Sequence, residues 1–149
     1  MIPADPLIVV LDTNVLLPLL VGRTRRALAL QQAWRDRQFF LVVTPPILDE
    51  LERVLHYPRV RRNLGLTAQD IENALDTLRR LACFLPGLVE GVTAVQADPS
   101  DNIFLACALE AGADYLVSQD AHLLNLKHYH GTQIVSLAQF AALLYRLSG

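Results

Sequence analysis

Four carboxylates stand out in this sequence because each one follows or borders an apolar segment that an α/β fold would bury. Asp12 ends the apolar run 7–11, and Asp120 follows a second run at 115–118. Asp101 lies in the first turn of a predicted helix, and Glu50 borders the apolar face of another. Like charges gathered in a cleft raise one another's pKa values, so such a group needs a compensating cation. Oxygen ligands suit Mg²⁺ or Mn²⁺, the ions that assist phosphate chemistry.

Asp12 has the clearest placement for function. In open α/β sheets, ligands collect outside the carboxyl ends of the strands, where an acid that directly follows five apolar residues would lie. Thr13 and Asn14 add a hydroxyl and an amide that could hold water, a metal ion or phosphate. Asp120 repeats this geometry, with Ser118 two residues before it. For both acids the structural alternative is an N-cap of the helix that follows.

Asp101 has a structural alternative as an acid in the first turn of a helix whose N-cap would be Asp98. It shares a helix face with Leu105 and Ala108, however, so its side chain points toward the core side. A carboxylate in that position needs a partner. We therefore expect a functional role for Asp101 and an auxiliary one for Asp98.

The fourth acid cannot be chosen from the periodicity of its helix. Glu50 and Glu52 flank opposite edges of the same apolar stripe at similar angles, whereas Asp49 points away from it. The residues alone therefore leave Glu50 and Glu52 equally good candidates.

The elements that would position these acids alternate between strands and helices. This order predicts one α/β domain over residues 1–149 with a mainly parallel sheet. Capping signals mark several helix starts: Thr44 before Pro45, and capping boxes at 67–70 and 136–139. We expect strands at 7–11, 39–43, 115–118 and 133–135, a short broken strand at 84–89, and helices at 23–37, 45–55, 68–82, 98–111, 121–126 and 137–147.

The bulk composition is that of a globular protein. Hydrophobic residues make up 52% of the 149 residues and charged residues 19%, which argues against disorder. The longest apolar stretch, 7–22, is too short and too polar to span a bilayer, and the first residues lack the basic region of a signal peptide. Cys83 and Cys107 lie in apolar stretches predicted to be helical, where we expect buried free thiols. These features fit a protein of the reducing cytosol.

The cationic residues are twelve arginines and one lysine, within a net charge of −2. Arginine matches phosphate oxygens with a rigid fork, so the best candidates for nucleic-acid backbone contacts are the groups 23–26 and 59–62. The alternative is that these side chains only form surface ion pairs. His128 and His130 are expected in a solvated loop, because no further soft ligand accompanies them, and His122 could approach a substrate.

Four segments together resemble the motifs of PIN-domain proteins, in the order of that family and over nearly the whole chain. They are Val-Leu-Asp-Thr-Asn-Val-Leu at 10–16, the helix acid within 47–51, Asp-Pro-Ser-Asp-Asn-Ile-Phe-Leu-Ala at 98–106, and Asp-Tyr-Leu-Val-Ser-Gln-Asp at 114–120. The branch most similar is the bacterial group described as toxin components of toxin–antitoxin pairs.

The resemblance implies a compact α/β/α sandwich and a nuclease that uses a divalent metal, Mg²⁺ or Mn²⁺, usually on RNA. It also implies an antitoxin partner and a homodimer, and it favours Glu50 over Glu52. Carried over onto this sequence, the acids of the metal site would be Asp12, Glu50, Asp101 and Asp120, and the supporting polar groups would be Thr13 or Asn14 and Ser118.

The resulting hypothesis is hydrolysis of RNA phosphodiester bonds, with Asp12 and Asp101 as direct metal ligands. One alternative is a non-catalytic module on the same fold that binds RNA or a protein. Another is an enzyme with an aspartyl-phosphate intermediate, because an Asp at the end of a first strand is also a nucleophile in some phosphatases. Those enzymes usually place a second Asp two residues later, where this chain has Asn14.

Overall fold

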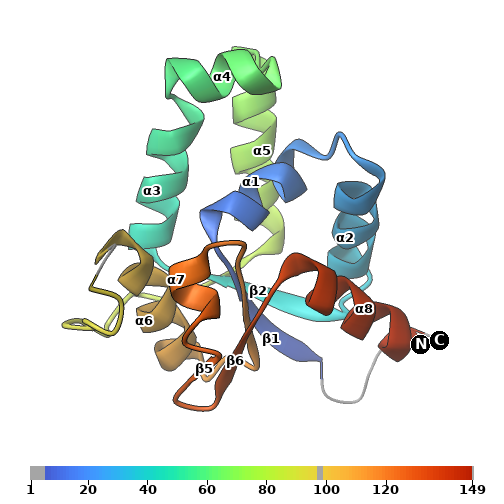
Figure 1. Ribbon diagram of the computed structural model, residues 1–149. Coiled ribbons are helices and arrows are strands. Elements are labelled where there is room, and N and C mark those ends of the chain that lie inside the picture. Colours follow the sequence, from blue (N-terminus) through green and yellow to red (C-terminus); the bar gives the residue numbers. More distant parts are fainter. Residues whose placement is uncertain (1–5, 97–98, 149) are drawn as a thin grey trace.

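A six-stranded sheet forms the centre of the protein, and its strand order is β3-β2-β1-β4-β6-β5 (Figure 1). The computed structural model describes residues 6–96 and 99–148. All neighbouring strands pair in parallel except β5 and β6, which form an antiparallel hairpin. The strands are β1 (Leu7–Leu11), β2 (Phe39–Val43), β3 (Cys83–Phe84), β4 (Tyr115–Val117), β5 (His128–Tyr129) and β6 (Thr132–Val135).

The register of the central strands brings two of the sequence motifs to one edge of the sheet. β1 lies between β2 and β4, and Leu11 at the end of β1 pairs with Val117 at the end of β4. The residues after these two strands therefore leave the sheet side by side. Successive residues Val9 and Val10 of β1 are both fully buried, so helices cover both faces of the sheet at this point.

Helices flank this sheet, in the layered α/β arrangement expected from the sequence. Phe140 of the last helix packs edge-on against Phe39 of β2, with 5.3 Å between ring centroids, and so fastens that helix to the core. The helices are α1 (Thr13–Val21), α2 (Arg25–Arg35), α3 (Pro45–Leu55), α4 (Pro58–Leu64), α5 (Ala68–Leu81), α6 (Asn102–Ala111), α7 (Ala121–Leu124) and α8 (Leu137–Ser148), with the short 3₁₀ helix η1 (Pro99–Asp101) before α6.

Helices α3, α4 and α5 form an arm that rises from the sheet, and α4 crosses its top (Figure 1). The apolar stripes of α3 and α5 are buried, and α1 contacts both of them. The short helix α4 buries no side chain. The base of the arm thus belongs to the core, and its tip is attached to the core through Leu66, which is buried, and through Val60 and Leu64, which are partly buried.

Most of the predicted elements are confirmed, and both predicted capping boxes form, whereas Thr44 precedes α3 without a capping hydrogen bond from its side chain. Thr67 and Asp70 form a reciprocal capping box at the start of α5. Ser136 and Gln139 do the same before α8, with N···O distances of 2.8 and 3.2 Å. The predicted helix 23–37 is shorter, because it begins after the N-cap Thr24 and is separate from α1. The arginine group 59–62, for which the sequence predicts neither helix nor strand, lies on α4.

The strand predicted over 84–89 is only partly confirmed. Cys83 and Phe84 pair with β2 and the Leu85 N–H donates to the carbonyl of Val43, but the backbone N–H groups of Gly87, Leu88 and Val89 donate instead to the carboxylate of Glu110 on α6. Cys83 is therefore exposed on an edge strand, contrary to the buried helical thiol expected, whereas Cys107 is buried as expected. Neither cysteine forms a disulfide.

The prediction of a loop at 128–130 is also partly wrong, because His128 and Tyr129 form β5 and pair with β6. A strand of two residues is too short to leave a periodic signal in the sequence. Within the described ranges, no helix has the length and apolar character needed to cross a membrane.

Candidate functional site

Asp12 occupies the point where β1 ends and α1 begins. Its backbone N–H donates to the carbonyl of Val117 at 3.0 Å, which continues the pairing of β1 with β4. Its carboxylate accepts two hydrogen bonds, from the backbone N–H of Thr13 and from the hydroxyl of Ser118, both at 2.6 Å. The residue is 5% exposed. Asp12 is thus an N-cap, as the structural alternative held, but it is a buried one with a partner from another strand.

Ser118 connects Asp12 to Asp120. Its hydroxyl is fully buried, donates to Oδ2 of Asp12, and accepts from the backbone N–H of Asp120 at 2.9 Å. Asp120 in turn accepts from the backbone N–H of His122 at 2.7 Å and caps α7. One serine hydroxyl therefore fixes two of the predicted acids relative to each other.

Glu50 reaches the same place from α3. The hydroxyl of Thr13 donates to its Oε2 at 2.6 Å, and Arg53, one turn further along the helix, lies 3.8 Å from Oε1. The Glu50 side chain is only 13% exposed. Glu52 instead pairs with Arg79 of α5 at 3.6 Å. The structure thus places Glu50, and not Glu52, beside the residue that follows Asp12.

The remaining residues of the predicted site are Asp101, Asn14 and Asp98. Asp101 lies at the N-cap position of α6 and is 6% exposed, so its predicted inward direction is confirmed. Helix α6 packs against β1, the strand that leads to Asp12. Asn14 is exposed on α1, and its Oδ1 accepts from the backbone N–H of Gln119 at 3.4 Å. Asp98 lies outside the described residues. A joint role of Asp101 with the other acids stays a prediction.

The electrostatics agree with a cluster around Asp12. Burial raises the pKa of Asp12, the hydrogen bonds from Ser118 and Thr13 lower it in part, and the charges of Glu50 and Asp120 raise it again. Three acids from three separate elements therefore lie close enough to repel one another. Sequence reasoning did not single out Arg53, although its spacing of three residues from Glu50 is the signal for such a pair.

A divalent cation fits the donor chemistry of this cluster. All the donors are hard oxygen atoms, and each Asp12 oxygen accepts one hydrogen bond from the protein and keeps a further lone pair. In the ranges that the structure describes, no three acidic, histidine or cysteine side chains are already arranged as a complete set of metal ligands. The residues thus suit Mg²⁺ or Mn²⁺ chemically.

Comparisons with known proteins agree with this fold. No curated protein matches the sequence. Among solved structures, the chain is similar to a chain in the crystal structure of VapBC2 from Rickettsia felis, which was solved with a bound DNA fragment from the VapBC2 promoter. The two share 12% identity and a TM-score of 0.55, over 87% of this chain and 98% of that chain, so the likeness is one of fold. The family model for the PIN domain matches residues 8–122, which include Asp12, Glu50, Asp101 and Asp120. The chain therefore belongs to the PIN domain family, whose members are generally nucleases.

Proposed function

We propose that this PIN domain is a metal-dependent endoribonuclease that hydrolyses RNA phosphodiester bonds. The observation that supports this most is that Glu50 and Asp120 lie close to the buried carboxylate of Asp12. Thr13 links Glu50 to this place, and Ser118 links Asp120 to it. Mutual repulsion of this kind destabilises the fold unless a cation compensates it. Acids held together at such a cost are typical of a functional site.

The residues of the chain would hold Mg²⁺ or Mn²⁺ through Asp12, Glu50 and Asp120, with Asp101 as the fourth predicted acid. When bound, such an ion polarises a phosphate oxygen and lowers the pKa of a coordinated water molecule. Ser118 ties the Asp12 carboxylate to the backbone of Asp120, and Thr13 orients Glu50. Burial of Asp12 limits the access of bulk water and so strengthens its interaction with a cation.

We further propose that the protein is the toxin of a toxin–antitoxin pair in the cytoplasm, that it forms a homodimer, and that a small antitoxin protein inhibits it. Membership of the PIN domain family and the fold shared with a VapBC2 chain support this assignment. A small open reading frame next to the gene would add support. Co-expression of that second protein, followed by co-purification and light scattering, tests the partner and the homodimer together.

The nuclease proposal predicts RNA cleavage that requires Mg²⁺ or Mn²⁺ and stops when EDTA is added. Asp12→Asn keeps the shape of the side chain but removes its charge, and it should lower the cleavage rate by about 10²-fold or more. Asp49→Asn is the matched control, because Asp49 is exposed on α3. Equal rates for the wild type and Asp12→Asn would contradict the proposal. Salt-dependent RNA binding without cleavage at any metal concentration would favour the non-catalytic module instead.

A further inference from the structure

The tip of the arm carries an uncompensated positive charge. Between Arg53 and Gln69 the chain has four arginines and no Asp or Glu. Three of them, Arg59, Arg61 and Arg62, lie on α4, and in the part of the chain that the structure describes none of these three forms an ion pair. Arg59 and Arg62 are exposed and share one face of the helix, since they are three residues apart.

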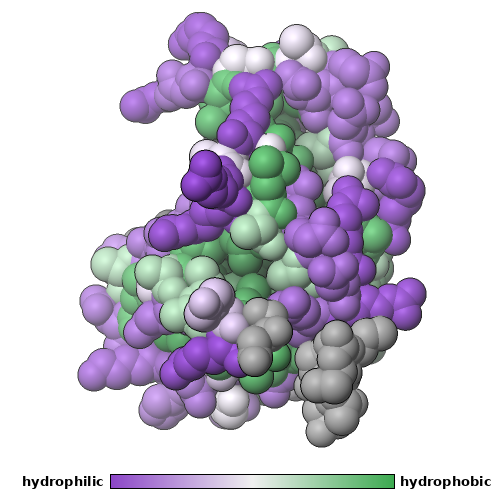
Figure 2. Space-filling model, turned by 90° about the vertical axis from the view of Figure 1, so that its right-hand side faces the viewer, coloured by the Kyte–Doolittle hydropathy of each residue, from purple (hydrophilic) through white to green (hydrophobic). Residues whose placement is uncertain are grey.

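Core packing explains only part of the sequence of α4, because Val60 and Leu64 are partly buried against the core but Arg59 and Arg62 are exposed. The helix has no buried side chain, whereas every other helix named above from α1 to α7 has at least one. The view from the side shows hydrophilic side chains at the top of the molecule and a concave outline below them (Figure 2). Arg59 and Arg62 take no part in this packing and are therefore free to contact a ligand.

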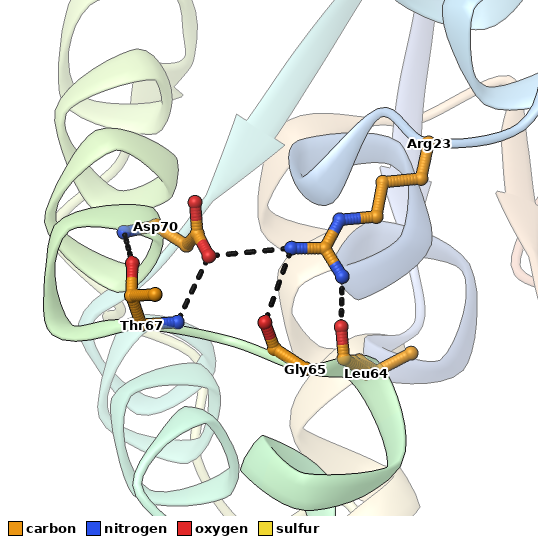
Figure 3. A network of polar contacts seen from close by, with 5 residues as sticks. All are labelled: Arg23, Leu64, Gly65, Thr67 and Asp70. Atoms are coloured by element: carbon orange, nitrogen blue, oxygen red, sulfur yellow. Dashed lines mark hydrogen bonds and ion pairs between the residues drawn. The ribbon is translucent and has the colours of Figure 1, made fainter.

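Arg23, at the start of the other arginine group, has a structural role instead (Figure 3). Its guanidinium donates to the carbonyls of Leu64 and Gly65 and pairs with Asp70 at 3.2 Å. Asp70 also accepts from the backbone N–H of Thr67 at 2.8 Å. The hydrogen bonds from the backbone and side chain of Thr67, together with Arg23, lower the pKa of Asp70. This network fixes the end of α4 to the segment between α1 and α2 and to the start of α5, so α4 is held at a defined place above the sheet.

The arginines of α4 lie at the far end of the helix that carries Glu50. With a rise of about 1.5 Å per residue, the end of α3 at Leu55 is only about 7–8 Å from the level of Glu50. Tyr57 sits in the turn between α3 and α4 and is 46% exposed. An exposed aromatic ring beside arginines, close to a candidate site for phosphate chemistry, is the combination that binds single-stranded nucleic acid.

We propose that Arg59 and Arg62 bind the phosphate backbone of single-stranded RNA, with Tyr57 as a stacking platform for one base, next to the acidic site. This inference rests on the proposed function, because it names the strand form and the path of that substrate. Arg53, paired with Glu50, lies on α3 between the acids and this surface, where a strand extending from a phosphate at the acidic site would pass.

The experiment measures binding of a short fluorescein-labelled RNA without secondary structure, by fluorescence anisotropy in EDTA and over a range of salt concentrations. The double variant Arg59→Gln/Arg62→Gln should weaken binding at least about tenfold. It should also reduce the slope of log K against log salt by about 1.4, since each phosphate contact with a single strand contributes about 0.7. Tyr57→Leu should weaken binding about tenfold while leaving the slope unchanged.

The matched control is Arg35→Gln/Arg37→Gln, which removes two exposed arginines at the end of α2, outside both arginine groups, and should change neither the affinity nor the slope. Because all the substituted side chains are exposed, these variants should keep the circular dichroism spectrum of the wild type. Equal RNA binding by the wild type and the α4 variant would overturn the inference and would favour an acidic protein partner for this surface. Tight binding of a duplex of the same sequence, insensitive to Tyr57→Leu, would also overturn it. Cleavage is not part of this assay, so failure of the nuclease proposal would be seen separately.

Discussion

At the scale of single residues, the buried carboxylate of Asp12 dominates the chemistry of this protein. Burial is the main reason that its pKa is raised, and the charges of Glu50 and Asp120 add to it. Ionised Asp12 is therefore less favourable in the folded chain than in the unfolded chain. This penalty is absent below the ordinary pKa of 3.8, grows as the pH rises, and is complete above the raised pKa.

The variant Asp12→Asn should consequently be more stable than the wild type at neutral pH, although it is expected to be inactive. Asparagine can still accept from the Thr13 N–H, and its amide can donate to Ser118. The gain in melting temperature, a few degrees at pH 7, should shrink as the pH falls toward 3.8. Thermal unfolding of the wild type and Asp12→Asn over a pH series measures this difference in melting temperature. A melting temperature below that of the wild type at pH 7 would indicate that Asp12 serves as a stabilising cap.

The choice between Glu50 and Glu52 gives a second prediction for individual side chains. Glu50 accepts from Thr13 beside Asp12, whereas Glu52 faces Arg79 and is 41% exposed. Glu50→Gln should reduce RNA cleavage by about tenfold or more, while Glu52→Gln should leave it within about twofold. Initial cleavage rates at saturating Mn²⁺ compare the two. A larger loss in Glu52→Gln would reverse the assignment.

These two glutamates also show where sequence reasoning ends at this scale. Both flank the same apolar stripe of α3, so the helix alone does not distinguish them. The distinction comes from Thr13, which is 37 positions away in the chain. By contrast, the positions of Asp12 and Asp120 follow from the strands directly before them, and the sequence predicted both. No local pattern identified Arg23 as the residue that fastens α4.

At the scale of elements, the sequence predicted helices well wherever their ends carry their own signals. The capping boxes before α5 and α8 are each contained within four residues, and both form. The strand predicted at 84–89 ends early because the backbone N–H groups of residues 87–89 donate to Glu110, which lies on the distant helix α6. The two-residue strand β5 depends on its pairing with β6, which a local pattern cannot encode.

Two helix ends allow a matched test of these local signals. Gly22 and Gly112 both cap a helix with a left-handed backbone, at φ +65° and +60°. Alanine at Gly112 meets open space, so it should cost only the backbone strain of about 1 kcal/mol. Alanine at Gly22 would place its Cβ 2.5 Å from the Gln31 amide, which now donates to the carbonyl of Leu19.

Gly22→Ala should therefore be the more destabilising of the two, by about 1 kcal/mol for the displaced hydrogen bond. Urea unfolding of both variants beside the wild type measures the difference, and the m-values should stay equal. If both substitutions cost the same, the Gln31 side chain moves aside freely and contributes little to the packing of α1 on α2.

At the scale of the whole molecule, the candidate site is assembled from parts that lie far apart in the chain. Asp12 and Ser118 directly follow β1 and β4, and Glu50 comes from α3. The parallel pairing of β1 with β4 sets the edge at which they meet. The global fold therefore holds like charges together, and a cation that binds only the folded chain should relieve the repulsion.

Titration with Mg²⁺ or Mn²⁺ should accordingly raise the melting temperature of the wild type. A ligand specific to the folded state stabilises by about 2.7 kcal/mol at a concentration 100 times its dissociation constant, which for a domain of this size is a shift of several degrees. Asp12→Asn should lose most of this shift because it removes the central charge, while Glu52→Gln should keep it. Sodium chloride at equal ionic strength separates specific binding from general screening, which would stabilise all three proteins alike. Equal shifts in the wild type and Asp12→Asn would mean that these acids act as helix caps and hold no ion.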